Sequence, residues 1–212
     1  RSTLFPYTTL FRSLFIDARD DLGDTVAGLD PDPDDADLLA YFADPHAPGL
    51  AERLVGRATS RTLYDPNAYH RTRCDAEPRP PATALLSRTD HVASGRPADP
   101  RQLITYSDGT GREAQHKAQA EPDAAGRPRW SGTGWTVYNN KDLPVRKYEP
   151  FFSTTHAFEF ARTAGVSAIV FYDPVGRAVA TLHPDGGYGK AVFDPWRLAA
   201  WDANDKIGRA HV

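Results

Sequence analysis

The chain has 212 residues, of which 40% are hydrophobic, and its 28 acidic and 25 basic residues give a formal net charge of −3. No segment approaches the roughly 18 consecutive apolar residues of a transmembrane helix, and the charge balance does not favour a mainly electrostatic nucleic-acid binder. With 16 glycines and 18 prolines, the composition indicates a turn-rich fold. The sequence contains no methionine and begins with Arg1.

Both ends of the sequence resemble translations of sequencing-adapter oligonucleotides. They are RSTLFPYTTLFRS at residues 1–13 and IGRAHV at residues 207–212. We therefore expect both ends to be artefacts and leave them out of the reasoning about the fold. Residues 14–206 are then expected to be an internal fragment of a longer protein, which would explain the missing methionine.

The next part of the chain, residues 14–58, is acidic and rich in proline, and its composition predicts a linker with short helices. Asp34 or Asp35 can cap the first helix, which would place three apolar residues on one side. These are Leu38, Leu39 and Phe42. A second short helix is predicted from Gly49 to about Gly56.

From residue 59 to residue 206 the sequence changes to short β-prone runs separated by Gly, Pro, Asp or Asn. The predicted strands are residues 61–64, 83–89, 102–107, 134–139, 144–149, 167–173, 177–183 and 189–194. Residues 111–120 are ambiguous, because their composition favours a helix whereas their position after a tight turn favours a polar strand. The sequence thus predicts a mainly β, antiparallel fold with one or two short N-terminal helices.

A weak internal repeat is the most informative feature of the sequence. Its clearest copy is YDPVGR at residues 172–177, and PDG and FD follow it further along the chain. An earlier copy at residues 106–112 is one residue longer, and a degenerate copy occupies residues 138–146. The residues assigned to the repeat are Tyr106, Asp108, Gly111, Arg112, Tyr138, Asn139, Asn140, Arg146, Tyr172, Asp173, Gly176, Arg177, Pro184, Asp185, Gly186, Phe193 and Asp194.

The chemistry of the repeat is structural. An Asp or Asn after the aromatic residue can accept backbone N–H groups of the turn, and Gly176 or Gly111 can supply a positive φ. The arginine then begins the returning strand, so each unit encodes strand, turn and strand. Tyr and Arg at one register can stack between neighbouring hairpins. Such units need neighbours to bury their apolar faces.

The segment YDPVGRAVATLHPDGGYGKAVFD resembles the YD repeat of the Rhs family. Further blocks, of which NNKDLPVRKYEPFF is the most specific, resemble in order a segment of bacterial insecticidal toxin-complex B-type proteins of the SpvB/TcaC/TcdB-like kind. The resemblance is strongest from residue 106 to residue 205. It departs at residues 142–143, where Asp-Leu replaces Gly-Lys, and at residues 109–111, where Gly-Thr-Gly replaces Gly-Phe-Gly.

The resemblance implies a function that the residues alone do not give. Toxin-complex B and C components build a hollow β-shell that encloses an unfolded toxic C-terminal region before translocation through the A component. This chain would be a secreted, extracellular segment of that wall. Its partners would be the remaining Rhs strands, the C and A components and the cargo polypeptide, with no nucleic acid and no membrane. The resemblance implies no catalytic residue, cofactor or metal.

Two other functions stay open from the sequence. The first is a surface adhesion or carbohydrate-binding module, for which the four tryptophans could form a platform; packing between hairpins is the alternative. These are Trp130, Trp135, Trp196 and Trp201. The second is a small hydrolase that uses Glu149 or His183, or pairs Glu149 with Glu159. His156 lies among phenylalanines and is expected to be a histidine at the edge of the core.

The remaining candidates for chemistry are expected to be structural. The single cysteine, Cys74, excludes an internal disulfide and is predicted to be an inert thiol, although His70 lies four residues before it. The glycine-rich segments at residues 131–134 and 185–187 lack the lysine and helix of a phosphate-binding loop and predict turns. Because a wall segment leaves strand edges unpaired, isolated residues 14–206 are expected to aggregate or to be partly disordered.

Overall fold

The structure is a computed structural model that describes residues 13–16, 23–30 and 32–203. The predicted adapter segments therefore lie outside the described residues, apart from Ser13. The described chain is mainly antiparallel β, as the sequence predicts, and it has three short α-helices where one or two were expected. No helix within these described ranges is both long and apolar enough to cross a membrane.

The chain divides into two compact units. Unit 1 contains the described residues up to Gly132 together with Phe152–Phe158, and unit 2 contains Thr133–Phe151 and the described residues from Glu159 onward. The predicted boundary between residues 58 and 59 does not coincide with this division. The reason is physical, because the helices before residue 58 pack into the same core as the strands after it.

Unit 1 is built on a sheet with the strand order β1-β2-β3-β4-β5-β6-β9. The strands are β1 (Ser13–Phe15), β2 (Ser60–Asp65), β3 (Ala82–Arg88), β4 (Pro100–Ser107), β5 (Glu113–Ala120), β6 (Arg129–Gly132) and β9 (Phe151–Ser153). The pairs from β1 to β6 are antiparallel. The ambiguous segment at residues 111–120 contains β5, so its position after a turn outweighs the helical propensity of its residues.

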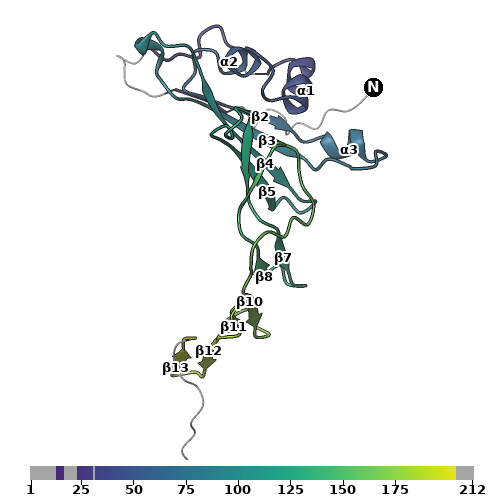
Figure 1. Cartoon of the computed structure of the whole chain (residues 1–212), viewed down its shortest axis with the longest axis vertical. Coiled ribbons are helices and arrows are strands. Elements are labelled where there is room, and N and C mark those ends of the chain that lie inside the picture. Colours follow the sequence, from purple (N-terminus) through teal and green to yellow (C-terminus); the bar gives the residue numbers. More distant parts are fainter. Residues whose placement is uncertain (1–12, 17–22, 31, 204–212) are drawn as a thin grey trace, which may run out of the picture. The chain divides into compact units, whose positions relative to one another are not determined.

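The helices of unit 1 are α1 (Asp35–Ala43), α2 (Leu50–Val55) and α3 (Ala68–Thr72), and a short 3-10 helix covers Val92–Ser94. The first two were predicted from the sequence, and Asp34 and Gly49 stand at their N-caps. Both pack against the sheet at β2, and α2 also contacts β3 and β4 (Figure 1). The third helix was not predicted, because it is a single short turn.

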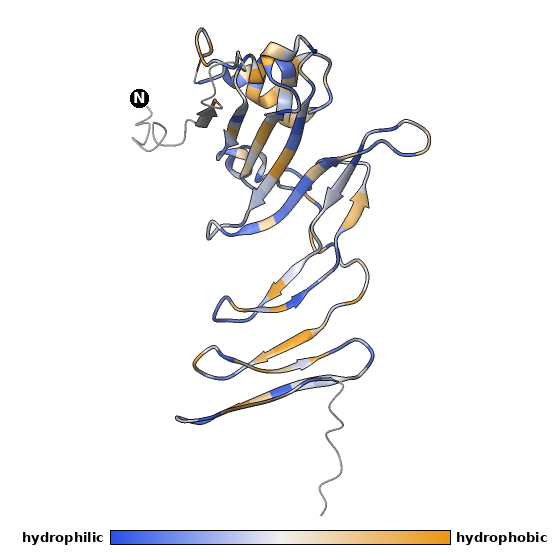
Figure 2. Ribbon diagram, turned by 90° about the vertical axis from the view of Figure 1, so that its left-hand side faces the viewer, coloured by the Kyte–Doolittle hydropathy of each residue, from blue (hydrophilic) through white to orange (hydrophobic). Residues whose placement is uncertain are grey.

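The core of unit 1 lies between α1, α2 and one face of the sheet. Its buried residues are Tyr41, Phe42, Leu50, Ala51, Leu54, Val55, Leu63, Ala82, Ala84, Leu86, Ile104, Tyr106 and Trp130. Buried and less buried positions alternate along β2, β3 and β4, as expected for a sheet with one covered face. Figure 2 shows the apolar residues gathered at these helices and strands.

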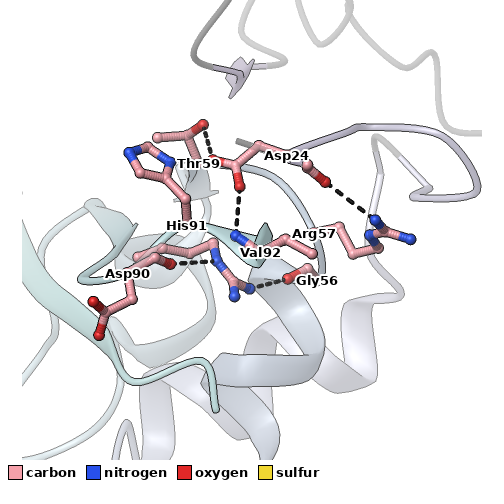
Figure 3. A network of polar contacts seen from close by, with 9 residues as sticks. Asp24, Gly56, Arg57, Thr59, Asp90, His91 and Val92 are labelled. Atoms are coloured by element: carbon pink, nitrogen blue, oxygen red, sulfur yellow. Dashed lines mark hydrogen bonds and ion pairs between the residues drawn. The ribbon is translucent and has the colours of Figure 1, made fainter. Parts of the chain in front are cut away.

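A polar network ties the start of unit 1 to its body (Figure 3). The Asp24 carboxylate is fully buried and accepts hydrogen bonds from the Val92 N–H (2.9 Å) and from the Thr59 hydroxyl (2.7 Å). It also contacts His91 Nδ1 at 2.8 Å. Burial opposes ionisation of Asp24, but these hydrogen bonds outweigh it and lower its pKa to about 2.

Unit 2 is a sheet with the strand order β13-β12-β11-β10-β8-β7, and its pairs are antiparallel. The strands are β7 (Thr136–Tyr138), β8 (Pro144–Lys147), β10 (Ile169–Tyr172), β11 (Ala178–Leu182), β12 (Tyr188–Phe193) and β13 (Leu198–Trp201). All described helices belong to unit 1, so the described part of unit 2 consists of strands and the loops that join them.

Candidate functional site

The candidate site is the set of hairpin turns that contain the sequence repeat, and the turn between β10 and β11 is its clearest example. The Asp173 N–H donates to the Arg177 carbonyl oxygen (2.9 Å), and the Gly176 N–H donates to the Asp173 carbonyl oxygen (3.0 Å). Gly176 has a φ of 89°. This is the three-residue hairpin loop that combines a type I turn with a left-handed residue.

The Asp173 side chain holds this turn together. Its Oδ1 accepts the N–H groups of Val175 (3.0 Å) and Arg177 (2.9 Å), and its Oδ2 accepts a bond from Arg177 Nε at 2.7 Å. Burial raises the pKa of Asp173, but its hydrogen bonds and the nearby guanidinium lower it below the ordinary value. The aspartate and the arginine of the repeat therefore form one closed unit around the turn.

The turn between β4 and β5 has the same construction. Asp108 Oδ1 accepts the N–H groups of Thr110 (2.8 Å) and Arg112 (3.0 Å), and Oδ2 accepts Arg112 Nε at 2.8 Å. The loop from Asp108 to Arg112 is as long as the loop from Asp173 to Arg177. The extra residue in this copy is Ser107, which lies before the aspartate at an irregularity in the strand register.

A further copy of the turn joins β5 to β6 at residues 123–128, which are not among the residues that the sequence analysis assigned to the repeat. Asp123 Oδ1 accepts the N–H groups of Ala125 and Arg127 (both 2.9 Å), and Oδ2 accepts Arg127 Nε at 2.8 Å. Gly126 has a φ of 76°. The signal was an Asp followed three residues later by Gly-Arg, but no Tyr precedes it.

The degenerate copy between β7 and β8 keeps the turn but not the arginine. Asn139 Oδ1 accepts the N–H groups of Lys141 (2.9 Å) and Leu143 (3.0 Å). Asp142 takes the place of the turn glycine with a φ of 60°, and Leu143 stands where the other copies have arginine. Arg146 therefore does not correspond to the repeat arginine; it lies within β8, opposite Val137 and Ile169. That part of the prediction was wrong.

Two residues of this degenerate copy also connect to its surroundings. Asn140 is exposed within the loop, and Tyr138 ends β7 at an irregularity in the register. The Lys141 ammonium donates to the carbonyl oxygen of Pro174, which lies in the turn between β10 and β11. These two turns of unit 2 thus contact one another directly.

The turn between β11 and β12 begins one residue earlier than the predicted Pro184-Asp185-Gly186. The His183 N–H donates to the Gly187 carbonyl oxygen (2.8 Å), and Gly186 has a φ of 84°. Asp185 Oδ1 accepts the Gly187 N–H at 2.9 Å. A histidine therefore occupies the position of the repeat aspartate, and the carboxylate acts from inside the loop, where Pro184 also lies.

The last turn, between β12 and β13, is shorter. Asp194 Oδ1 accepts the N–H groups of Trp196 (2.9 Å) and Arg197 (2.8 Å). Just before it, the Phe193 ring lies 4.5 Å from the Arg177 guanidinium carbon. The predicted stacking between hairpins is therefore made by arginine and phenylalanine, within unit 2.

The tyrosines of the repeat have other partners. The Tyr172 hydroxyl donates to the Pro144 carbonyl oxygen at 2.9 Å and so links β10 to the start of β8. Tyr106 is buried in the core of unit 1, and its hydroxyl donates to the His156 carbonyl oxygen at 2.8 Å. Burial raises the pKa of Tyr106 well above its ordinary value.

This arrangement is similar to solved toxin-complex structures. A structure of TcdB2-TccC3 matches with a TM-score of 0.56 and 26% identity over 70% of this chain and 8% of that chain. A Photorhabdus luminescens Tc holotoxin pore matches with a TM-score of 0.58 and 20% identity, over 70% of this chain and 10% of that chain. The fold is that of a Tc toxin-complex Rhs-like region. No protein-family model and no curated relative matches the sequence.

The Rhs-like region described here is a small part of such proteins, since it spans about a tenth or less of the matched toxin-complex chains. The identity of 20% to the holotoxin supports the fold alone, whereas the TcdB2-TccC3 match also carries sequence likeness.

The other candidates for chemistry do not gather into a site. Cys74 is exposed, and the described residues contain no group of three or more His, Cys, Asp or Glu side chains placed to hold a metal ion. Trp130 belongs to the core of unit 1, whereas Trp135, Trp196 and Trp201 belong to unit 2. Trp196 is 92% exposed.

The glycine-rich segment at residues 131–134 is not shaped for a phosphate. A Cβ on Gly134 would lie 2.3 Å from the Glu149 carbonyl oxygen and 2.4 Å from the Tyr148 carbonyl oxygen. Carbonyl oxygens repel a phosphate, so this glycine serves a close approach of two backbone segments. The Glu149 carboxylate itself lies against Gly165, whose Cβ would meet Glu149 Oε2 at 2.0 Å.

A small cavity of about 160 Å³ lies in unit 1. Its walls are mostly apolar, and Asp65, Arg79, Tyr106 and His156 contribute the polar groups. Asp65 is already paired with Arg71 at 2.5 Å.

Proposed function

We propose that this chain is a structural segment of the shell of a secreted toxin complex, which encloses and helps to deliver a toxic C-terminal cargo. The segment itself has no catalytic role in this proposal. Its partners are the neighbouring Rhs strands of the same shell, the C and A components of the complex, and the cargo polypeptide.

The observation that carries the proposal is the sheet of unit 2. Its hairpins form a single sheet, the described residues of unit 2 include no helix, and several large apolar side chains of unit 2 are exposed. They include Val166, Phe171, Val175, Leu182, Tyr188, Val192, Leu198 and Trp201. A soluble domain of its own would be expected to cover such a surface, whereas a wall segment has neighbours that do so.

The similar structures supply the second support. One of them is described as TcdB2-TccC3 without its hypervariable C-terminal region, and it matches with a TM-score of 0.55 and 21% identity over 70% of this chain and 10% of that chain. By analogy with that hypervariable C-terminal region, the cargo in our proposal is a variable polypeptide at the C-terminal end of the complex. The aspartate-centred turns would then keep the hairpins of the wall in register.

Exchange of the matched segment tests this proposal directly. The residues of this chain that match TcdB2-TccC3 replace the corresponding segment of that complex, and protease cleavage of its hypervariable C-terminal region is followed. We expect the region to be cut as slowly as in the parent complex. A complex that fails to assemble, or one whose region is cut as fast as a free polypeptide, contradicts the proposal.

A second candidate function is carbohydrate binding at the surface of unit 2, because Trp196 is 92% exposed in a hairpin turn. Aromatic faces of this kind stack on sugar rings. A glycan array probed with the whole chain and with Trp196→Ala decides the matter. Binding that the variant loses supports this function, and an array without signal excludes it for the glycans tested.

A further inference from the structure

The cavity of about 160 Å³ lies wholly within unit 1, where several of its elements begin or end. The end of α1, the end of β2 and the starts of α3 and β3 meet there, and Phe152–Phe158 passes beside them. A cavity of about 150 Å³ with apolar walls holds one benzene molecule. This cavity therefore has room for a single ring of that size.

Small side chains create this space. Four alanines from four separate segments stand on the walls, and larger apolar side chains complete them. The alanines are Ala43, Ala68, Ala82 and Ala157, and the larger residues are Phe42, Pro80 and Phe158. An apolar ring placed among them would be removed from water, which favours its binding.

The wall formed by His156, Ala157 and Phe158 is fixed to the rest of unit 1. The His156 carbonyl oxygen accepts the Tyr106 hydroxyl at 2.8 Å, and His156 Nε2 donates to the Phe42 carbonyl oxygen at 3.1 Å. The Phe158 and Tyr106 rings pack with 5.7 Å between their centres. The cavity is thus formed before any ligand enters it.

The charged groups of the cavity differ in how they are paired. Both carboxylate oxygens of Asp65 accept bonds from Arg71, at 2.6 Å and 2.5 Å, so this negative charge is balanced. The guanidinium of Arg79, in contrast, makes no hydrogen bond or ion pair within the described part of the chain. Its positive charge is close enough to Tyr106 to oppose the rise of the Tyr106 pKa that burial causes. An anionic group beside Tyr106 would therefore meet an available cation.

The backbone holds Arg79 in position. Prolines stand on both sides of it, at Pro78 and Pro80, and they restrict the conformations of this segment. The Arg79 N–H donates to the hydroxyl of the buried Thr72 at 2.8 Å, and that hydroxyl donates to the Ala68 carbonyl oxygen at 2.9 Å. Binding at Arg79 would thus order only its side chain.

We propose that this cavity is a binding site for a small aromatic carboxylate, whose ring lies between the apolar walls and whose carboxylate pairs with the Arg79 guanidinium. A guanidinium offers two parallel N–H donors that match the two oxygens of a carboxylate. Benzoate has the size and charge that the site requires. The site would be the same whether or not the chain forms part of a shell.

An NMR titration of the whole chain with sodium benzoate, followed at the backbone amides, tests the proposal. We expect saturable shifts at Ala68, Ala82 and Ala157 but not in β11 and β12, with a dissociation constant of about 5 mM or tighter. Benzyl alcohol, which keeps the ring without the charge, should bind at least about threefold more weakly. Acetate, which keeps the charge without the ring, should bind at least about tenfold more weakly.

Two variants, each with a matched control, assign the binding to the cavity. R79Q should weaken benzoate binding at least about threefold, whereas R73Q, at an exposed arginine that does not line the cavity, should leave it unchanged. A157L should fill the cavity from a half-buried wall and abolish the shifts, whereas A124L, in the turn between β5 and β6, should keep them.

Three results would overturn the proposal. They are the absence of saturable shifts with benzoate, equal binding of benzyl alcohol or acetate, and an R79Q variant that binds benzoate like the unmodified chain. The comparison of the three ligands uses the unmodified chain, so it decides the matter even if A157L does not fold.

Discussion

Asp142 and Gly176 occupy the same position in successive hairpin turns of unit 2. Both residues have a positive φ, of 60° and 89° respectively, and the N–H of each donates to the carbonyl oxygen of the residue that opens the turn. Glycine adopts this conformation without a steric penalty, whereas an aspartate adopts it at some cost. The hairpin between β7 and β8 therefore keeps the repeat geometry in a strained form.

Replacing Asp142 by glycine should stabilise this hairpin. We expect D142G to gain up to about 1 kcal/mol, because the left-handed conformation no longer carries the penalty of a Cβ atom. Hydrogen exchange of the β7 and β8 amides measures the gain. The reverse change at the matched turn, G176D, should weaken the β10 and β11 hairpin. Equal protection in D142G and the unmodified chain would show that the aspartate is not strained.

The aspartate of the turn between β4 and β5, Asp108, should matter more than its half-buried position in a loop suggests. D108A removes the acceptor of two backbone N–H groups and of the Arg112 side chain. We expect a loss of about 1–3 kcal/mol, measured by denaturant unfolding of unit 1. D108N keeps one carbonyl oxygen for the N–H groups and should lose less. If both variants unfold like the unmodified chain, the side chain does not support the turn.

The turn chemistry was the most predictable part of the candidate site. An Asp followed at a fixed spacing by Gly-Arg predicts the conformation of the turn, because the carboxylate, the left-handed residue and the guanidinium all lie within five residues. The copy at Asp123 was not predicted, because no tyrosine precedes this aspartate as it does in the other copies. Arg146 was misassigned because sequence alone does not show that Leu143 takes the arginine position.

The partners of the aromatic residues were less predictable, since they lie far away in the sequence. Nothing near Tyr106 indicates that its hydroxyl reaches His156, and nothing near Arg177 indicates that it lies over Phe193. The residues that are buried in the core were equally hard to predict from the sequence. Leu39 was expected on the buried side of the first helix, but it is 45% exposed, and Tyr41 is fully buried instead. The fold class depends on local pattern and could be predicted, whereas these contacts depend on tertiary packing.

The Tyr41 hydroxyl provides a test of the core of unit 1. It donates to Gln102 Oε1 at 2.7 Å, and both side chains are buried. Y41F leaves the Gln102 oxygen without this donor, so we expect a loss of about 1–3 kcal/mol in the free energy of unfolding. The matched change in the same helix, L39A, removes an exposed side chain and should cost less than about 0.5 kcal/mol. The opposite order of the two losses would contradict the described orientation of α1.

Gly134 should not tolerate a side chain. A Cβ at this position would lie 2.3 Å and 2.4 Å from two backbone carbonyl oxygens, which cannot move aside like the end of a flexible side chain. We expect G134A to destabilise unit 2 by about 1–3 kcal/mol and to lower the protection of the β7 and β8 amides in hydrogen exchange. G109A is the control, because a Cβ there would meet nothing within 4 Å. An unchanged G134A would mean that these segments do not approach each other closely.

The buried Asp24 should make the stability of unit 1 depend on acid. Because its folded pKa of about 2 lies below the ordinary value, its contribution is present above about pH 4 and is lost as the pH falls toward 2. D24N presents an N–H group to the donors of Thr59 or His91, so we expect a loss of about 1–3 kcal/mol at neutral pH.

Urea unfolding at about pH 6 and about pH 3 checks this prediction for Asp24. The unmodified chain should lose more stability between these two pH values than D24N does, since the variant has no carboxylate to protonate. D75N, at an exposed aspartate after α3, should unfold like the unmodified chain at both values. If D24N and the unmodified chain lose the same amount, the network around Asp24 does not hold the start of unit 1 in place.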